Sequence, residues 1–344
     1  MLKYFQSSFI FSFIGLGLAF VVASLYADNS AGIVQYLFIT FVLSILEISL
    51  SFDNAIVNAK VLETMTPAWR HRFITWGMVI AVFGMRLIFP LAIVCVMTAI
   101  GPWDALVMAA QRPKEYAEIM LSSHVQIAAF GGSFLLMVAL GFFLDQHKDD
   151  HWINWFERPL VKLGKVESVQ IGVTIILILI LTGIVQEGEK LKFLVPALWG
   201  VITHIIVDGI SSILESDEGT PLDLGRASAA SFIYLEVLDA SFSFDGVVGA
   251  FAITHNLFII MIGLSIGAFF VRSLTIYFVE EKTLKTFRFL EHGAFYAILS
   301  LAVMMLLGPF FHIPEWVTGV SGAVFILLSL VASLRHKKTL SVTE

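Results

Sequence analysis

The sequence predicts an all-helical polytopic membrane protein with about ten transmembrane helices and an inverted internal repeat. Of its 344 residues, 58% are hydrophobic and only 14% are charged, whereas soluble domains carry roughly 25% charged residues. Apolar runs long enough to cross a bilayer recur along the whole chain. Two of these runs carry the same acidic motif. Most of the chain is therefore expected to lie out of water.

The apolar runs define the expected spans. With a window of about 20 residues, they fall at 8–27, 32–59, 73–98, 122–144, 169–186, 193–214, 228–253, 256–279, 289–308 and 316–334. No soluble domain or long linker separates them, so we expect residues 1–344 to form a single membrane domain. The first run exceeds the apolar core of a signal peptide, about 7–15 residues, and we interpret it as a retained span. Cleavage near Ala27 is the alternative.

The distribution of basic residues predicts the orientation. Between the spans, one side of the membrane would carry only Arg112, Lys114, Lys190 and Lys192. The other side would carry both termini and most of the remaining Lys and Arg. The positive-inside rule then places both termini in the cytoplasm, and we expect a bacterial inner (plasma) membrane. No basic patch suggests nucleic-acid binding, so membrane lipid is the expected environment.

The acidic motif is the clearest internal repeat. Residues 47–54 read Glu-Ile-Ser-Leu-Ser-Phe-Asp-Asn, and residues 239–246 read Asp-Ala-Ser-Phe-Ser-Phe-Asp-Gly. In each case a span with glycines and one arginine follows, Arg86 in the first and Arg272 in the second. The second to fourth spans therefore match the seventh to ninth, giving repeat A at about 32–144 and repeat B at about 228–308. Units five spans apart run in opposite directions, which is typical of secondary transporters with a midplane substrate site.

Helical geometry separates the polar residues of the motif into faces. At 100° per residue, one stripe of the second span carries Glu47, Ser51, Asn54 and Asn58, and one stripe of the seventh carries Glu236, Asp239, Ser243 and Gly246. Asp53 and Asp245 fall off these stripes, each one helical turn from Ser49 or Ser241. Either the helices show polar faces to two neighbours or they unwind near the motif. Asn54 and Gly246 favour unwinding, as in the broken helices of transporters.

The balance of charges in the spans predicts the sign of a ligand. Six acidic residues are expected there, against two basic ones: Glu47, Asp53, Asp208, Glu236, Asp239 and Asp245, with Arg86 and Arg272. An unpaired carboxylate in hydrocarbon is costly, and intramembrane acids indicate function. A bound cation or protons would remove this cost, whereas an oxyanion would be repelled. Oxygen ligands suit Mn²⁺, Mg²⁺ or Ca²⁺, and the single cysteine argues against Cu(I) or thiolate zinc. We expect Glu47, Asp53, Asp239 and Asp245 to bind the metal.

Three alternatives stay open at this level. The acids can form a structural ion-pair network with Arg86 and Arg272. The two arginines can be counter-charges that stabilise the empty site, or they can extend to the membrane interface. His204 and Asp208 share a helix face in the sixth span and can form a ligand pair, a proton relay or a structural hydrogen-bonded pair.

Both copies of the motif carry a family resemblance. Glu-Ile-Ser-Leu-Ser-Phe-Asp-Asn-Ala at 47–55 and Asp-Ala-Ser-Phe-Ser-Phe-Asp-Gly-Val at 239–247 resemble the paired motifs of TerC-family integral membrane proteins, in particular a longer branch first classified as a domain of unknown function. The resemblance covers about the second to ninth spans. It implies the LysE-type transporter class, with roles in tellurite resistance and manganese export, and it places Glu47, Asp53, Asp239 and Asp245 at the family's acidic positions. The His204–Asp208 pair and Glu236 depart from the pattern.

The leading hypothesis is a secondary transporter, not an enzyme, that exports a divalent cation, with Mn²⁺ as the first candidate and proton coupling. It needs no resident cofactor. The alternative is a membrane scaffold without transport activity in metal or tellurite stress, although the short loops offer few docking surfaces. An intramembrane aspartyl protease would need Asp53 and Asp245 as a dyad, but the Gly-x-Gly-Asp and Tyr-Asp signatures of that class are absent.

Overall fold

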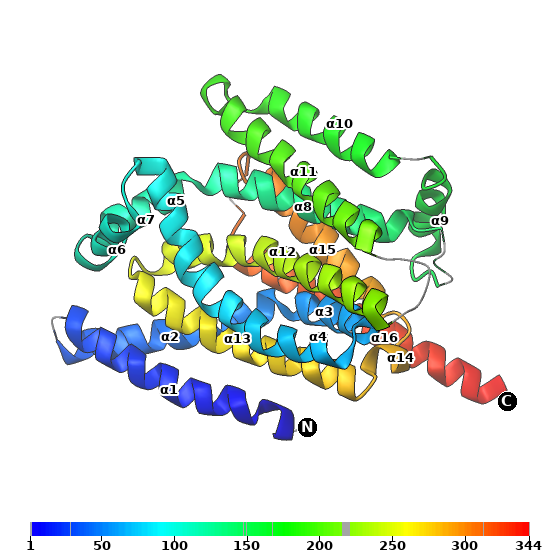
Figure 1. Cartoon of the computed structure of the whole chain (residues 1–344), viewed down its shortest axis with the longest axis horizontal. Coiled ribbons are helices and arrows are strands. Elements are labelled where there is room, and N and C mark those ends of the chain that lie inside the picture. Colours follow the sequence, from blue (N-terminus) through cyan, green and yellow to red (C-terminus); the bar gives the residue numbers. More distant parts are fainter. Residues whose placement is uncertain are drawn as a thin grey trace.

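The protein is a bundle whose long helices lie side by side at various crossing angles, while some of the short helices run across them (Figure 1). The structure, a computed structural model, describes residues 2–27, 29–146, 148, 150–166, 168–214, 221–311 and 313–343. Within these residues every regular element is a helix. The side chains of Asp245, Trp316 and a few other helical residues lie outside the description.

The helices of the first half are bounded as follows. They are α1 (Leu2–Tyr26), α2 (Ser30–Leu50), α3 (Phe52–Thr64), α4 (Pro67–Arg72), η1 (Phe73–Gly77), η2 (Ile80–Ile88), α5 (Phe89–Thr98), α6 (Pro102–Gln111), α7 (Pro113–Ser122), α8 (His124–Leu144) and α9 (Asn154–Leu163). Proline occupies the first turn of α4, α6 and α7. At that position its missing N–H costs no helical hydrogen bond.

The second half holds the longest helices. They are α10 (Val169–Ile184), η3 (Glu187–Glu189), α11 (Lys190–Leu214), α12 (Pro221–Ile253), α13 (Leu257–Glu280), α14 (Thr283–Thr286), α15 (Leu290–Leu307) and α16 (Glu315–Thr343). Asn256 caps α13, because its side chain accepts hydrogen bonds from the N–H groups of Phe258 and Ile259 at 3.0 and 3.2 Å.

The predicted fold class is confirmed. Eight helical segments of the described chain are long and apolar enough to span a membrane. The other two expected spans are also helical, since α10 is an apolar helix of 16 residues and the seventh span lies within the 33-residue α12. Both termini lie at the same end of the bundle, as an even number of crossings requires (Figure 1). The chain is an all-helical membrane protein.

The two copies of the motif differ in backbone. The span expected at 32–59 is interrupted at Ser51, which separates α2 from α3 and has φ −105° and ψ 16°. The second copy lies inside α12, which continues through Gly246. Of the two alternatives left open, unwinding near the motif is found in the first copy, at Ser51. The second copy stays helical through Gly246, although this glycine favoured unwinding.

The third span contains wide helical turns. η1 and η2 are π-helical, and the N–H of Phe89 reaches back five residues to the carbonyl of Gly84. Pro90 follows directly and has no N–H to offer the carbonyl of Arg86, which loosens the α-helical pattern at this point. Wide turns of this kind are frequent at functional sites, and here they contain Phe73 and Arg86.

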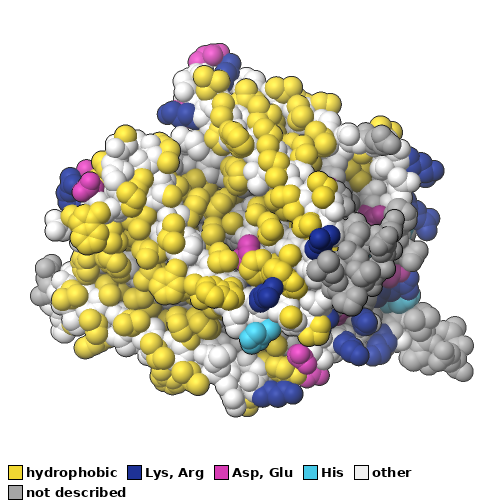
Figure 2. All heavy atoms as spheres, in the orientation of Figure 1, with side chains coloured by type: hydrophobic (Ala, Val, Ile, Leu, Met, Phe, Trp, Pro, Cys, Tyr) yellow, Lys and Arg dark blue, Asp and Glu magenta, His cyan; other side chains and the backbone are white. Residues whose placement is uncertain are grey.

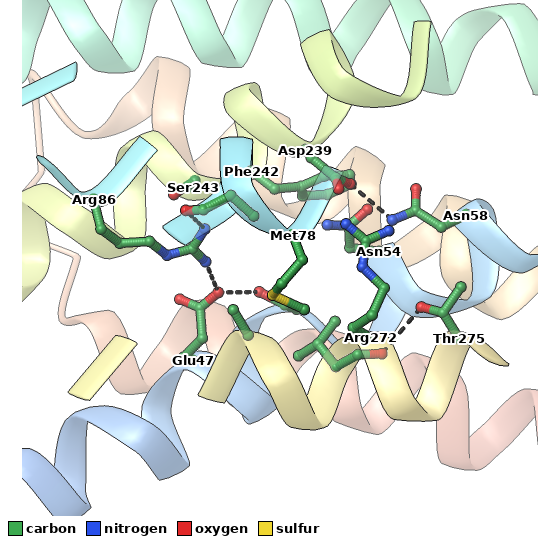
Figure 3. Close-up of a pocket in the computed structure, with 14 residues that line it drawn as sticks. Glu47, Asn54, Asn58, Met78, Arg86, Asp239, Phe242, Ser243, Arg272 and Thr275 are labelled. Carbon is green, nitrogen blue, oxygen red and sulfur yellow. Dashed lines mark hydrogen bonds and ion pairs between the residues drawn. The ribbon is translucent and has the colours of Figure 1, made fainter. Parts of the chain in front are cut away.

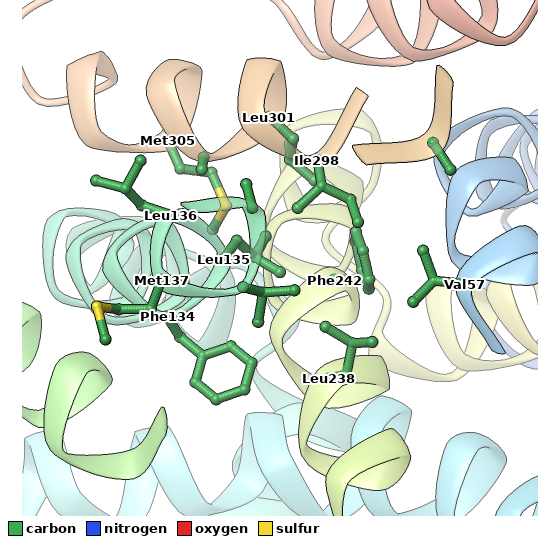
Figure 4. Packing of buried hydrophobic residues seen from close by; sticks show 14 of the residues in the cluster. Val57, Phe134, Leu135, Leu136, Met137, Leu238, Phe242, Ile298, Leu301 and Met305 are labelled. Atoms are coloured by element: carbon green, nitrogen blue, oxygen red, sulfur yellow. The ribbon is translucent and has the colours of Figure 1, made fainter. Parts of the chain in front are cut away.

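Three helices form the centre of the bundle. In α8, α13 and α15, 83%, 72% and 67% of the most apolar window is buried, against 22% in α1 and α2. Leucine, isoleucine and methionine side chains of α8 and α15 pack against Leu238 and Phe242 of α12 (Figure 4). Apolar side chains also cover most of the visible outer face (Figure 2). A broad apolar exterior is the arrangement that fits a surrounding bilayer.

The helices of the two motif copies run in opposite directions (Figure 1). α2 packs against α13, and α12 packs against η2. Likewise α3 packs against α15, and α12 against α8. These reciprocal contacts are the ones that two inverted units would make. The boundaries of repeats A and B stay a prediction.

Candidate cation site between the motif copies

A small buried cavity lies where the two motif copies approach each other (Figure 3). Its free volume is about 30 Å³, enough for one or two waters or a partly dehydrated ion. Side chains from α2, α3, η2, α12 and α13 enclose it. The expected site residues that line it are Glu47, Ser51, Asn54, Asn58, Arg86, Asp239, Ser243 and Arg272. The polar stripes predicted for the two spans therefore face one shared cavity.

Glu47 and Arg86 form the first half of the site. Both side chains are almost fully buried, and Arg86 Nη2 donates a short hydrogen bond to Glu47 Oε1. Ser51 donates to the same oxygen at 3.3 Å. Arg86 Nη1 donates to the backbone carbonyl of Ala81 at 2.5 Å. Glu47 is thus paired with a cation supplied by the chain itself.

The backbone of α13 lies directly behind Glu47. A Cβ atom at Gly267 would lie 2.5 Å from Glu47 Cβ and 2.7 Å from Glu47 Cγ. Such distances are below any normal contact, so only glycine allows this approach. On the opposite side, Gly246 of the second motif copy faces Glu47. A Cβ atom at Gly246 would lie 3.8 Å from Glu47 Oε2.

Asp239 forms the second half of the site, and it is held differently. Its Oδ1 accepts a hydrogen bond of 2.8 Å from Asn58 Nδ2, which comes from the other repeat. Asn54 lies beside the same carboxylate. Arg272 is close enough to interact electrostatically with Asp239 and Glu236. Within the described residues, however, no hydrogen bond or ion pair joins Arg272 to either carboxylate.

Arg272 is buried against an aromatic ring. Its guanidinium carbon lies 3.9 Å from the centre of the Phe73 ring, a cation–π contact. Both Arg86 and Arg272 are therefore buried beside carboxylates, and neither reaches the protein surface.

Several polar atoms around the cavity have no hydrogen-bond partner among the described residues. The oxygens are Asn54 Oδ1, Asn58 Oδ1 and Ser243 Oγ. Buried oxygens of this kind are normally paired, and an unpaired one costs about 1–3 kcal/mol. Three such oxygens beside two carboxylates are ligands that a hard cation would satisfy.

Four expected site residues lie elsewhere. Asp53 is buried in the first turn of α3, where its Oδ1 accepts the N–H of Asn54 at 3.0 Å; a carboxylate at this end also suits the helix dipole. Ser49 is exposed and Ser241 is buried, and each donates to a carbonyl of its own helix. Glu236 lines a shallow neighbouring pocket instead. The side chain of Asp245 lies outside the described residues.

His204 and Asp208 lie away from the cavity. His204 is buried, with its ring 5.6 Å from that of Phe134 on α8. Asp208 is exposed and interacts with it electrostatically. Their common face on α11 is as expected, but the structure does not bring them to Glu47 or Asp239.

Sequence reasoning missed several residues at the site. Met78, Phe242 and Thr275 line the cavity, and Phe73 supports Arg272. Thr275 lies one turn after Arg272, so helical spacing from the arginine would have found it. Phe73 had no such signal, because a single phenylalanine in an apolar span is indistinguishable from a core residue.

The described chain holds no group of three or more His, Cys, Asp or Glu side chains at metal-binding separation. A cation in this cavity would therefore depend on Glu47 and Asp239 together with amide and hydroxyl oxygens. This is the hard, oxygen-only ligand set of alkaline-earth and manganese ions.

The fold and cavity define an integral membrane protein with a buried polar site between helices of opposite direction. The chain belongs to the family described as "protein of unknown function (DUF475)", whose model matches residues 52–340. No curated protein and no solved structure matches it.

Proposed function

We propose that the protein is a secondary transporter that exports a divalent metal cation, with Mn²⁺ as the first candidate substrate, in exchange for protons. One observation carries this proposal. Acidic residues from the two motif copies, Glu47 and Asp239, line one buried cavity. Three oxygens beside them have no hydrogen-bond partner in the described part of the chain. A cation is the ligand that completes such a site.

The charges around the cavity support a cation. Glu47 is neutralised by Arg86. On the other side, Asp239 lines the cavity and Glu236 lies in the neighbouring pocket, and both interact electrostatically with Arg272. With Glu236 included, the three carboxylates exceed the two arginines by one. The excess negative charge would be neutralised by a bound cation or by a proton. An oxyanion would have to approach against these carboxylates.

The two halves of the site support alternating access. In one half, Arg86 is bonded to Glu47. In the other half, the described residues show no bond between Arg272 and Asp239, although the two motif sequences are related. In an inverted-repeat transporter, the two repeats exchange roles between the inward-facing and outward-facing states. Rocking of one repeat against the other would thus close one half-site while it opens the other. On release of the metal, the freed carboxylates would take up protons.

The proposal also draws on the resemblance of the two motif copies to TerC-family proteins. That resemblance implies manganese export, with Glu47 and Asp239 at the family's acidic positions. The cytoplasmic location of both termini and the bacterial plasma membrane belong to the same proposal, because export requires entry from the cytoplasmic side.

The test is metal flux in proteoliposomes with an imposed pH gradient, using a panel of Mn²⁺, Mg²⁺, Ca²⁺ and Zn²⁺. We expect saturable Mn²⁺ flux that Glu47→Gln or Asp239→Asn abolishes. Ser49→Ala is the matched control, because Ser49 belongs to the same motif but lies outside the cavity. Its flux should equal that of the parent. Absence of flux of every metal, together with stoichiometric protein partners, would instead support the scaffold alternative.

A further inference from the structure

The two arginines of the cavity are held in different ways. Arg86 is hydrogen-bonded to Glu47, the acid of its own repeat. Arg272, its counterpart, lies over the ring of Phe73, and Asp239 instead accepts a hydrogen bond from Asn58. Its Nη1 has no hydrogen-bond partner among the described residues. A buried guanidinium with an unused donor would be expected to turn toward the nearby carboxylate. Its observed position therefore calls for a structural cause.

Two residues of the π-helical segment η1 lie beside the Arg272 guanidinium. Phe73 is fully buried, and its ring lies against the Arg272 guanidinium at 3.9 Å. Gly77, at the other end of η1, leaves room beside the same group. A Cβ at Gly77 would lie 2.8 Å from Arg272 Nη2 and 2.5 Å from Glu236 Oε1. The ring of Phe73 and the bare backbone of Gly77 thus form a pocket that holds the Arg272 guanidinium with the Glu236 carboxylate nearby. We call this pocket the Arg272 seat.

The position of the seat matters for the cavity. Arg272 comes from α13 and Asp239 from α12, and both side chains line the cavity. A guanidinium bonded to Asp239 would occupy the place of a substrate cation, as Arg86 does at Glu47. A cation–π contact is strongest for a desolvated arginine, so the ring of Phe73 gives the buried guanidinium a partner other than Asp239.

We propose that Phe73 and Gly77 are positioning residues that hold Arg272 off Asp239 and thereby keep this carboxylate available to the substrate cation. The inference rests on the proposed function. In this proposal Arg272 competes with the substrate cation for Asp239. How readily Arg272 reaches Asp239 therefore sets the affinity of the site for the cation.

The test measures Mn²⁺ affinity of the purified full chain in detergent, with free Mn²⁺ quantified by its electron paramagnetic resonance signal. Phe73→Leu removes the ring but keeps an apolar side chain, and we expect its Kd to rise about tenfold. Phe73→Tyr keeps the ring and should retain the parent affinity. Phe134→Leu is the matched control, because Phe134 is equally buried but packs near His204. Its Mn²⁺ affinity should be unchanged.

A double-mutant cycle separates this role from a general packing effect. In an Arg272→Gln background there is no guanidinium to release, so adding Phe73→Leu should leave the Kd unchanged. Gly77→Ala is the second variant, and it should weaken binding as Phe73→Leu does. Thermal unfolding and gel filtration establish that each variant is folded.

The outcomes distinguish the two proposals. If the parent and Phe73→Leu bind Mn²⁺ equally well, the role proposed for the Arg272 seat is contradicted. The same holds if Phe73→Leu weakens binding to the same extent in the Arg272→Gln background. In both cases the transport proposal stands. If the folded parent binds no Mn²⁺, the proposed function is contradicted, and the seat with it.

Discussion

Glu157 shows how one buried charge is stabilised outside the membrane-spanning helices. Its carboxylate is fully buried on α9 and binds Lys148 Nζ at 2.8 Å and Tyr296 Oη at 3.2 Å. The N–H groups of Trp152 and Ile153 and the ring of His292 complete the network. Burial alone would raise the pKa of Glu157, but the hydrogen bonds from His292, Lys148 and Ile153 lower this pKa to about 2.

This network predicts a pH-dependent stability. Because the folded-state pKa of Glu157 lies below its ordinary value of 4.5, the carboxylate stabilises the fold above that pH. The contribution is lost as the pH falls toward 2. We expect Glu157→Gln to lower the free energy of unfolding by about 3 kcal/mol at neutral pH. Thermal unfolding of both proteins between neutral pH and about pH 3 should show the difference shrinking; a constant difference would contradict this role.

At the cavity, helical spacing correctly predicted most of the polar residues that line it. The stripes of Glu47, Ser51, Asn54 and Asn58 and of Asp239 and Ser243 follow from 100° per residue, and the structure places all of them around one cavity. Glu236 shared the second stripe but lies beside Gly77 instead. Phe73 could not be predicted, because its role depends on a wide turn and on a partner from a distant helix.

At the scale of elements, close helix packing positions the site. α2 and α13 meet through Gly263 and Gly267. A Cβ at Gly263 would lie 2.7 Å from Leu43 Cβ. On η1, Gly77 precedes Arg86 by the same spacing that separates Gly263 from Arg272. Both repeats thus place a glycine for close approach ahead of their arginine.

This packing predicts a large effect of one methyl group. Gly267→Ala would force α13 away from α2 and displace Glu47, at a cost of about 1–3 kcal/mol of overpacking. We expect a lower unfolding temperature and loss of Mn²⁺ flux. Gly172→Ala is the matched control, because a Cβ at Gly172 on α10 meets nothing within 4 Å. Equal stability of the two variants would show that the α2–α13 approach is not as close as described.

Element boundaries could be predicted from hydropathy only in part. All ten expected spans are helical, since apolar length determines which segments can cross a bilayer. The sequence could not show that the first copy of the motif breaks at Ser51 while the second stays helical within α12, because the two copies are nearly alike in sequence. The π-helical turns of the third span depend on Pro90 and on packing around Arg86, which hydropathy does not report.

At the scale of the whole molecule, two inverted motif copies meet around one polar cavity in an apolar bundle. Asn58 of the first copy donates to Asp239 of the second, and Gly246 of the second faces Glu47 of the first. Neither copy forms the site alone. The central claim is therefore that one cation site needs both acids: Asp239 as the available ligand, and Glu47 as the partner that holds Arg86.

Equilibrium dialysis of the purified chain against Mn²⁺ tests that claim most directly. We predict one Mn²⁺ per chain in the parent, and loss of this site in both single variants, Glu47→Gln and Asp239→Asn. The double variant should bind no less than either single variant, because each acid is needed for the same ion. Undiminished Mn²⁺ binding by either single variant, or two ions lost one at a time, would contradict the shared site.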